Sequence, residues 1–298
     1  MLTCVLPVVG QTPAAPVPVD PMIHWRNATV ALGQEVTIGT ETKFIVTGSA
    51  VIATLDGKRA CLLTARHMVV DPANGQLTRA LWMRVASVGG EHEVPKSLPL
   101  FDGKGKNLWV VANDGSDLAV IPLPPHPSYL TPNYDAVFAS DFAETDDDIF
   151  QGAPVLVLGY PQVLRESDNT NPFSTSPIAR HGIIAWIDPS GPLSKPFLVD
   201  ANLYEGNSGG PVFRVKTGFD RFGNFNVGGQ QLKFIGIVSK GNVQASSVVT
   251  NDGKVTKSSI DGGIPQDEFA VVRAIGGIGV IEPVSRVKTL LDTYFAKH

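Results

Sequence analysis

Short apolar runs rich in β-branched residues recur along the chain and are separated by turn residues. Two of them, 44–53 and 60–64, flank the turn sequence LDGK at 55–58, and this pattern predicts a β-hairpin. Similar runs predict further strands at 80–87, 108–112, 117–121, 153–159, 181–187, 197–201, 211–215 and 233–239. Because no long helical pattern interrupts these runs, we predict an all-β protein.

A helical pattern occurs only at the C-terminal end of the chain. Apolar residues there recur on one helix face, namely Val284, Val287, Leu290, Leu291 and Tyr294. Proline is favoured in the first turn of a helix, so Pro283 marks its start. We predict an amphipathic helix over 284–298.

Proline-rich segments divide the chain into parts. Residues 1–21 are either a disordered leader or a secretory signal that lacks its positive start, and a periplasmic or secreted location is favoured over a cytoplasmic one. Proline cannot donate to a β-ladder, so the proline-dense segment 122–135 is interpreted as a linker between two β domains, 22–121 and 136–283. Within the second, the long stretch 242–277 contains the sequence NDG at 251–253, which predicts an extra hairpin.

Composition narrows the classes of protein. Hydrophobic residues make up 43% of the chain and charged residues 17%, which excludes a highly charged disordered protein. The 30 glycines and 23 prolines fit a chain with many turns. The net charge of −4 provides no overall basic field, so we expect no nucleic-acid partner. No run of 18 apolar residues is present, so no membrane span is expected either.

The two cysteines do not indicate a disulfide framework or a metal site. Cys4 and Cys61 are too few for a disulfide scaffold, and neither belongs to a Cys/His group with metal-ligand spacing. We therefore expect no metal and no cofactor. Cys61 lies in an apolar run and is interpreted as a core residue. The glycine-rich segment 276–279 is interpreted as a turn between strands, because no phosphate-binding context follows it.

The strongest chemical signal is the sequence GNSGGP at 206–211. A serine that attacks a carbonyl carbon needs backbone N–H donors at the developing oxyanion. Glycine allows the unusual backbone dihedrals of such a loop and lets a substrate approach closely. We predict Ser208 as the nucleophile, with the amides of Gly206 and Ser208 as the oxyanion hole.

A serine hydroxyl also needs a base that takes its proton. His67 follows the apolar run 60–64 and is the candidate base. Asp117 opens another apolar run and is the candidate partner that fixes the tautomer of the imidazole, with Asp114 as the next candidate. Each residue alone is more often structural, so the argument depends on the set.

Three motifs together make a resemblance specific. They are TARH at 64–67, DLAV at 117–120 and GNSGGP at 206–211, and in this order they resemble the trypsin-like serine peptidases. The sequence VDAN at 199–202 is similar to the bacterial HtrA/Deg-like branch. The resemblance covers about residues 40–295. It implies two six-stranded antiparallel β-barrels, a site in the cleft between them and a C-terminal helix on the second barrel.

The resemblance also implies a polypeptide substrate. The segment 234–241 resembles the family strand that pairs with an extended peptide, which assigns substrate contacts to Ser239, Lys240 and Gly241. Counting back from Ser208 places Asn202 near the floor of the primary pocket. Because Asn202 is not acidic, we expect small to medium apolar residues rather than Arg or Lys. The sequence leaves the oligomeric state open.

The sequence departs from the family pattern at some positions, and these departures limit which family properties can be expected of this chain. Asn207 replaces the aspartate that pairs with a new N-terminus in animal digestive relatives, so that activation step is not expected. No PDZ-like segment follows the helix, which argues against an HtrA-style chaperone role.

Two other functions compete with a serine endopeptidase. One is a non-catalytic homologue that binds peptides in the same cleft. The other is an α/β-hydrolase, whose Gly-x-Ser-x-Gly pattern is also satisfied. It is disfavoured because 212–215 is predicted as a strand rather than a helix, and only His298 lies downstream of the serine in a suitable order.

Overall fold

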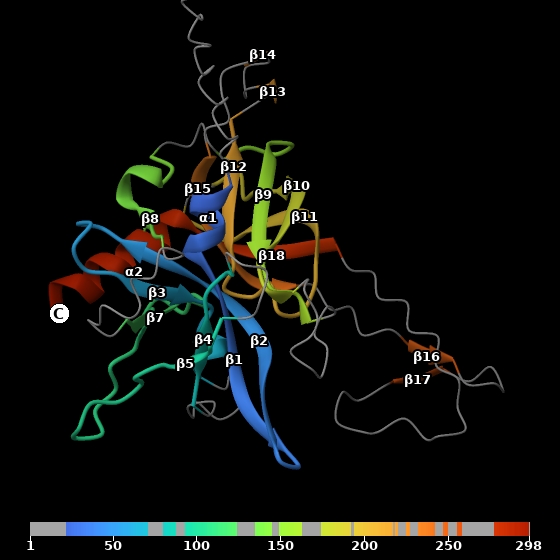
Figure 1. Cartoon of the computed structure of the whole chain (residues 1–298). Coiled ribbons are helices and arrows are strands. Elements are labelled where there is room, and N and C mark those ends of the chain that lie inside the picture. Colours follow the sequence, from blue (N-terminus) through green and yellow to red (C-terminus); the bar gives the residue numbers. More distant parts are fainter. Residues whose placement is uncertain are drawn as a thin grey trace, which may run out of the picture.

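The computed structural model confirms the all-β class and the two-unit organisation (Figure 1). The structure describes residues 22–70, 80–87, 93–123, 135–144, 149–162, 174–191, 194–216, 218–219, 225–226, 232–241, 247–249, 255–257 and 277–297. The leader 1–21 and most of the proposed linker 122–135 lie outside these residues. The predicted domain boundaries therefore stay predictions.

The N-terminal unit is a sheet of eight strands in the order β5-β4-β1-β2-β3-β7-β6, with β8 parallel to β2. Its strands are β1 (Thr29–Ile38), β2 (Glu41–Thr54), β3 (Cys61–Thr64), β4 (Trp82–Arg84), β5 (Lys96–Ser97), β6 (Val110–Val111), β7 (Ala119–Pro122) and β8 (Val137–Phe138). The resemblance implied a closed six-stranded barrel here. Among the described residues the sheet is open, because its outermost strands β5 and β6 are only two residues long and no ladder joins them.

The C-terminal unit is a closed antiparallel barrel of six strands, as expected. The strands are β9 (Pro154–Gly159), β10 (Ile178–Trp186), β11 (Phe197–Leu203), β12 (Pro211–Val215), β15 (Leu232–Gly241) and β18 (Gly277–Pro283). They follow the order β10-β11-β18-β15-β12-β9, and β9 pairs with both β12 and β10 to close the ring. Closure leaves the barrel without a free edge strand along most of its length.

The interpretation of 276–279 as a turn is wrong. Residues 277–279 begin β18, which pairs with β11 on one side and β15 on the other. A β-carbon on Gly279 would meet the end of the Leu203 side chain of β11, so the two strands pack closely here. The sequence pattern showed the glycines but not the neighbouring strands that they pair with.

The other strand predictions are confirmed in position, although several boundaries differ. Every predicted run contains a strand, and the hairpin expected around 251–253 is formed by β16 (Ser247–Val249) and β17 (Val255–Lys257). A second small hairpin, β13 (Gly218–Phe219) with β14 (Phe225–Asn226), was not predicted. Strand β1 was also missed, because Gly33 interrupts its apolar pattern at a β-bulge against β2.

The described α-helices, α1 and α2, each contact both β units. The predicted C-terminal helix is confirmed as α2 (Val284–Lys297), and all five apolar residues of its predicted face are buried. It contacts β15 and β18 of the barrel and also β7 of the N-terminal sheet. Helix α1 (Ile23–Ala28) was not predicted, and its Trp25 ring packs 4.7 Å from that of Phe213 in β12.

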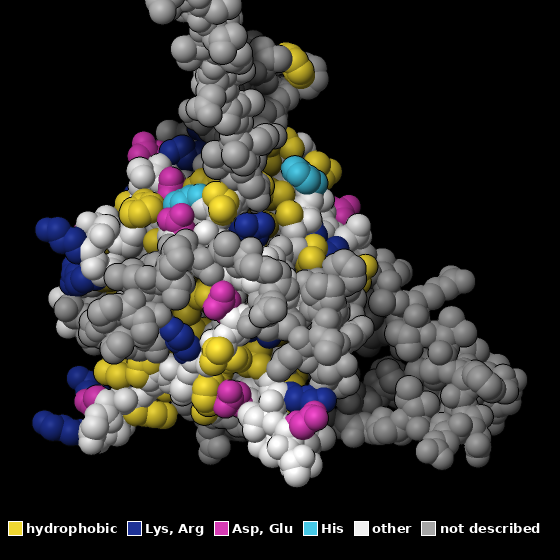
Figure 2. Space-filling view, in the orientation of Figure 1, with side chains coloured by type: hydrophobic (Ala, Val, Ile, Leu, Met, Phe, Trp, Pro, Cys, Tyr) yellow, Lys and Arg dark blue, Asp and Glu magenta, His cyan; other side chains and the backbone are white. Residues whose placement is uncertain are grey.

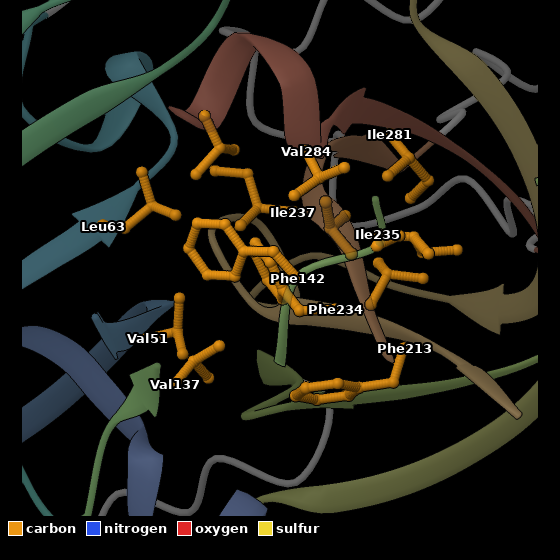
Figure 3. Packing of buried hydrophobic residues seen from close by; sticks show 14 of the residues in the cluster. Val51, Leu63, Val137, Phe142, Phe213, Phe234, Ile235, Ile237, Ile281 and Val284 are labelled. Carbon is orange, nitrogen blue, oxygen red and sulfur yellow. The ribbon is translucent and has the colours of Figure 1, made fainter. Parts of the chain in front are cut away.

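A shared apolar core joins the two β units. Phe142 contacts Phe234 of β15 at a ring-centroid distance of 5.2 Å, and Val51 and Leu63 reach the same cluster from β2 and β3 (Figure 3). Cys61 belongs to this cluster and is fully buried, as its interpretation as a core residue requires. The site described below therefore lies between units that are packed against each other.

The described charges on one face of the molecule are mixed in sign. On the face shown in Figure 2, the described Lys and Arg side chains are scattered and lie among acidic and apolar ones. No helix in the described part of the chain is long and apolar enough to cross a membrane.

A histidine between two carboxylates fastens α1 to the segment that follows the linker. Nδ1 of His24 lies 2.7 Å from Asp135 Oδ2, and Nε2 lies 3.9 Å from Asp141 Oδ2. The carboxylates of Asp141 and Asp135 raise the pKa of His24 above its usual value, against the opposing effect of burial. Protonated His24 therefore binds this segment more strongly than neutral His24.

This arrangement predicts a pH-dependent contribution to stability. Because the folded-state pKa is raised, the stabilisation is fully present below the unfolded value of about 6.5 and is lost as pH rises through the folded value. His24→Asn should lower the free energy of unfolding at pH 5.5 by at most about 1 kcal/mol, and by less at pH 8.5. Urea unfolding at both pH values measures the difference.

The matched control is His181→Asn on β10. His181 is exposed and makes no ion pair with another described residue, so its replacement should have the same small effect at both pH values. An equal effect of His24→Asn at both pH values would show that the imidazole is not held by charge.

Candidate active site

His67 lies in a single 3-10 turn at the end of an apolar strand. All four residues of β3 are buried, Ala65 is still extended, and the turn Arg66–Met68 follows. This change of backbone conformation brings the imidazole to the surface, where its side chain is 28% exposed. Its Nδ1 lies 2.8 Å from Asp117 Oδ2.

Asp117 accepts hydrogen bonds at both carboxylate oxygens. The backbone N–H of His67 donates to Oδ1 at 3.0 Å, and the Ser239 hydroxyl of β15 donates to Oδ2 at 2.7 Å. Burial alone would raise the pKa of Asp117, but the hydrogen bonds from His67 and Ser239 outweigh it and hold that pKa below its usual value. The carboxyl group is therefore ionised near neutral pH.

The backbone of Asp117 is held as firmly as its side chain. Its carbonyl accepts the N–H of Arg66 at 3.1 Å, and its own N–H donates to Glu282 Oε1 at 3.1 Å. Asp114, the second candidate carboxylate, instead accepts the N–H and hydroxyl of Ser116. Of the two aspartates, the structure places Asp117 against the imidazole.

The loop that carries Ser208 depends on glycines at two positive-φ positions. Gly206 has φ +91° and Gly209 has φ +82°. A β-carbon on Gly209 would overlap both the Ser49 carbonyl and the Thr64 hydroxyl, so no side chain fits there. Just before the loop passes into β12, the Gly209 N–H donates to the Val238 carbonyl at 2.7 Å.

The amides of the serine loop differ in whether a described residue accepts their hydrogen bond. The N–H groups of Asn207, Gly209 and Gly210 all donate to backbone carbonyls. Within the described part of the chain, no acceptor binds the N–H of Gly206 or of Ser208. The amides of Gly206 and Ser208, the predicted oxyanion donors, thus have no acceptor among the described residues.

Ser49 of β2 makes four hydrogen bonds, two of which connect the N-terminal sheet to the serine loop. Its N–H donates to the Ser208 carbonyl at 2.8 Å, and its hydroxyl donates to the Gly206 carbonyl at 2.7 Å. The hydroxyl accepts the N–H of Tyr160 at 2.9 Å, and the Ser49 carbonyl accepts the Thr64 hydroxyl at 2.8 Å. Ser49 is fully buried, so each of these polar groups needs its partner.

The two hydrogen bonds from Ser49 to the serine loop, called the Ser49 bridge below, also bring this loop close to the turn that carries His67. A β-carbon on Gly48, next to Ser49, would lie 2.6 Å from the sulfur of Met68 and 3.3 Å from the carbonyl oxygen of Ser208. Met68 follows His67 directly. The backbone of Gly48 therefore lies between Met68 and Ser208, and a side chain at this position would meet both.

The predicted substrate residues are placed on two strands that are not neighbours. Ser239 lies at a β-bulge between Val238 and Lys240, and Lys240 is exposed, with Gly241 at the end of β15. Asn202 is on β11, which β18 separates from β15. It is exposed, has φ +51° and also lies at a bulge. The role of Asn202 in the pocket stays a prediction.

Sequence reasoning did not single out Ser49, Glu282 or Arg286. A weak signal exists for each, because Ser49 and Glu282 are polar residues inside apolar runs and Arg286 follows Glu282 at the i+4 position.

In the described ranges, no group of three or more His, Cys, Asp or Glu side chains could hold a metal ion.

Comparison with known proteins agrees with this geometry. A family model described as a trypsin-like peptidase domain matches residues 48–219, which span all three motifs and more than half of the chain. No curated protein sequence matches the chain.

Similar solved structures include two forms of one mycobacterial protein and one enterobacterial protein. The inactive form of Rv3671c from M. tuberculosis H37Rv, a serine-to-alanine mutant, is 16% identical with a TM-score of 0.42, and the alignment covers 98% of each chain. The active form of the Rv3671c protease is 18% identical with a TM-score of 0.41, covering 97% of this chain and 93% of that one. The serine endoprotease from Yersinia pestis is 16% identical with a TM-score of 0.46, covering 93% and 67%.

The Ser49 bridge predicts a specific loss of serine reactivity. Ser49→Ala leaves the Gly206 carbonyl and the Tyr160 N–H unpaired, which should lower the free energy of unfolding by about 1–3 kcal/mol. Because the loop loses its anchor, labelling of Ser208 by a fluorophosphonate should slow by about tenfold or more, in keeping with the large effects of small displacements. Labelling rates and urea unfolding measure the two effects.

Thr54→Val is a matched control on the same strand. The buried Thr54 hydroxyl also joins a carbonyl to an amide, donating to Arg59 O at 2.7 Å and accepting from Gly57 N at 2.9 Å. It lies at the turn after β2, away from the serine loop, so its loss should lower stability without slowing labelling. Equal labelling of wild type and Ser49→Ala would mean that the hydroxyl is structural only.

Proposed function

The chain belongs to the family of trypsin-like peptidase domains and is a serine-type peptidase, and from that premise we propose that it is an endopeptidase with a His67–Asp117–Ser208 triad. It cleaves a peptide bond through an acyl-enzyme on Ser208. His67 is the general base and then the general acid, and Asp117 orients it. The amides of Gly206 and Ser208 bind the oxyanion.

The observation that carries this proposal is the contact between His67 and Asp117. An ionised carboxylate can only accept hydrogen bonds, so Nδ1 of His67 at 2.8 Å must carry the proton. In a neutral imidazole, Nε2 then holds the lone pair that a general base needs. The second bond, from the His67 backbone N–H to the same carboxylate, fixes the turn from which the ring extends.

The proposed reaction follows from these roles. The Ser208 oxygen attacks the substrate carbonyl carbon while its proton passes to His67 Nε2, and the oxyanion of the tetrahedral intermediate accepts the N–H groups of Gly206 and Ser208. The C–N bond breaks as His67 gives that proton to the leaving amine. Water then attacks the acyl-enzyme with His67 as base, which releases the carboxylic acid and restores the Ser208 hydroxyl.

The end of β15 supports an extended polypeptide as the substrate. The β12–β15 ladder ends at the pair Pro211–Ile237, so residues 239–241 extend beyond it. No described strand pairs with 239–241 on that side. A peptide can add there as a further strand, with its backbone bonds giving affinity and a side-chain pocket giving selectivity for small to medium apolar residues.

Replacing the proposed catalytic groups should abolish turnover while the fold is kept. Ser208→Ala should lose fluorophosphonate labelling and peptide cleavage, and Asp117→Asn should lower kcat by roughly 10⁴-fold, because the amide stabilises the wrong tautomer of His67. Cleavage of a quenched fluorescent peptide library measures kcat, and mass spectrometry of the fragments identifies the bonds that are cut.

Asp114→Asn is the matched control, since it removes the other candidate carboxylate three residues away. Its kcat should stay within a few-fold of the wild type. Cleavage that survives Ser208→Ala would refute the proposed nucleophile. If the folded protein binds peptides but neither labels nor cleaves, it is a non-catalytic peptide-binding homologue.

A further inference from the structure

We propose that Glu282 and Arg286 form a positioning pair for Asp117, which fastens the triad carboxylate to the second barrel and to α2. The proposal rests on the proposed function, in which Asp117 orients His67. Neither residue of the pair contacts His67 or Ser208 within the described structure, so the pair acts through Asp117.

Glu282 is a buried carboxylate with both oxygens in use. It lies in β18 between the buried residues Ile281 and Pro283, and its side chain is only 6% exposed. Oε1 accepts the backbone N–H of Asp117 at 3.1 Å, and Oε2 accepts Nη1 of Arg286 at 3.0 Å. A buried charge is costly unless it is paired and hydrogen-bonded, and here each oxygen has a separate partner.

Arg286 occupies a position that helix electrostatics disfavours. It lies in the first turn of α2, where the positive end of the helix dipole repels a cation, and that turn contains no acidic residue. The arginine is compensated by Glu282 and lies 3.8 Å from Asp114 Oδ2. Its Nε also donates to the Ser194 carbonyl at 2.9 Å. The contact with Glu282 joins α2 to the backbone of Asp117.

The pair completes the restraint on Asp117. The side chain is held by His67 and Ser239, and the carbonyl by Arg66, but among the described residues only Glu282 binds the N–H. Without that bond the backbone at Asp117 has an unpaired donor and one anchor fewer. Because His67 is bound to Asp117 at two points, a displaced carboxylate displaces the imidazole with it.

The first test compares two replacements of Glu282. Glu282→Gln keeps an acceptor for the Asp117 N–H, whereas Glu282→Leu removes it. We expect Glu282→Leu to lower kcat about tenfold to a hundredfold with KM unchanged, and Glu282→Gln to restore most of that loss, because a shift of one ångström can have an effect of this size. A folded Glu282→Leu variant with wild-type kcat would overturn the proposal.

The second test asks whether the effect passes through Asp117. In an Asp117→Asn background, adding Glu282→Leu should lower kcat no further, since the group that it positions has already been disabled. If Glu282→Leu lowers kcat in the Asp117→Asn background by as much as it does in the wild type, Glu282 does not act through Asp117.

Arg59 provides the matched control for α2. Its Nη1 donates to the Phe295 carbonyl at 3.1 Å, so it also fastens α2 to the N-terminal sheet, but at the opposite end of the helix. Arg286→Met should lower kcat less than Glu282→Leu, because Glu282 loses a partner but still accepts the Asp117 N–H, whereas Arg59→Met should not lower it. Equal losses in both would mean that any loosening of α2 is sufficient, and the specific pair would be refuted.

A readout without turnover separates this proposal from the proposed function. Hydrogen exchange at the Asp117 amide, followed by NMR, should speed up in Glu282→Leu and stay slow in Glu282→Gln. If Ser208-dependent cleavage is absent but this difference is seen, the proposed function fails while the pairing holds. If Glu282→Leu does not fold, the double variant Glu282→Leu/Arg286→Leu replaces the ion pair by apolar residues and takes its place in every test.

Discussion

The rest of the site depends on how the interface between the N-terminal sheet and the C-terminal barrel, called the seam below, is fixed. His67 and Asp117 come from the N-terminal sheet and Ser208 from the C-terminal barrel, so a small slip between the units would separate them. Hydrogen bonds cross the seam in both directions: Ser239 and Glu282 of the barrel hold Asp117, and Ser49 of the sheet holds the Gly206 and Ser208 carbonyls. The geometry of the reacting groups is thus set by polar contacts at two separate points.

These polar contacts are effective because of the apolar core around them. Phe142, Phe213 and Phe234 pack into a cluster that includes residues of both units, which keeps water away from the seam. A buried hydroxyl or carboxylate is costly without a partner and rigid with one, since each lost bond leaves a group that nothing else can satisfy. Ser49 and Glu282 therefore restrict the backbone more strongly than an apolar residue could.

The sequence predicted the parts of the fold and site that have local causes. Short runs of apolar, β-branched residues located β2, β9, β12 and β15, and the glycines of GNSGGP reflect the backbone angles that their loop adopts. Ser49 and Glu282 were missed because their partners lie far along the chain: Ser49 binds Gly206 across 157 residues, and Glu282 binds Asp117 across 165. A single polar residue in an apolar run does not say which distant group it will meet.

The position of Asn202 shows the same limit for selectivity. Counting back from Ser208 assumes that β11 is regular, yet its register against β18 shifts between Asp200 and Leu203, and Asn202 has φ +51° with an exposed side chain. The next side chain, Leu203, is buried against Gly279 instead. A bulge changes which side of the sheet a residue faces without changing the residue. The side of β11 on which Asn202 lies is therefore determined by where the strand bulges, and hydrophobic periodicity does not record that property.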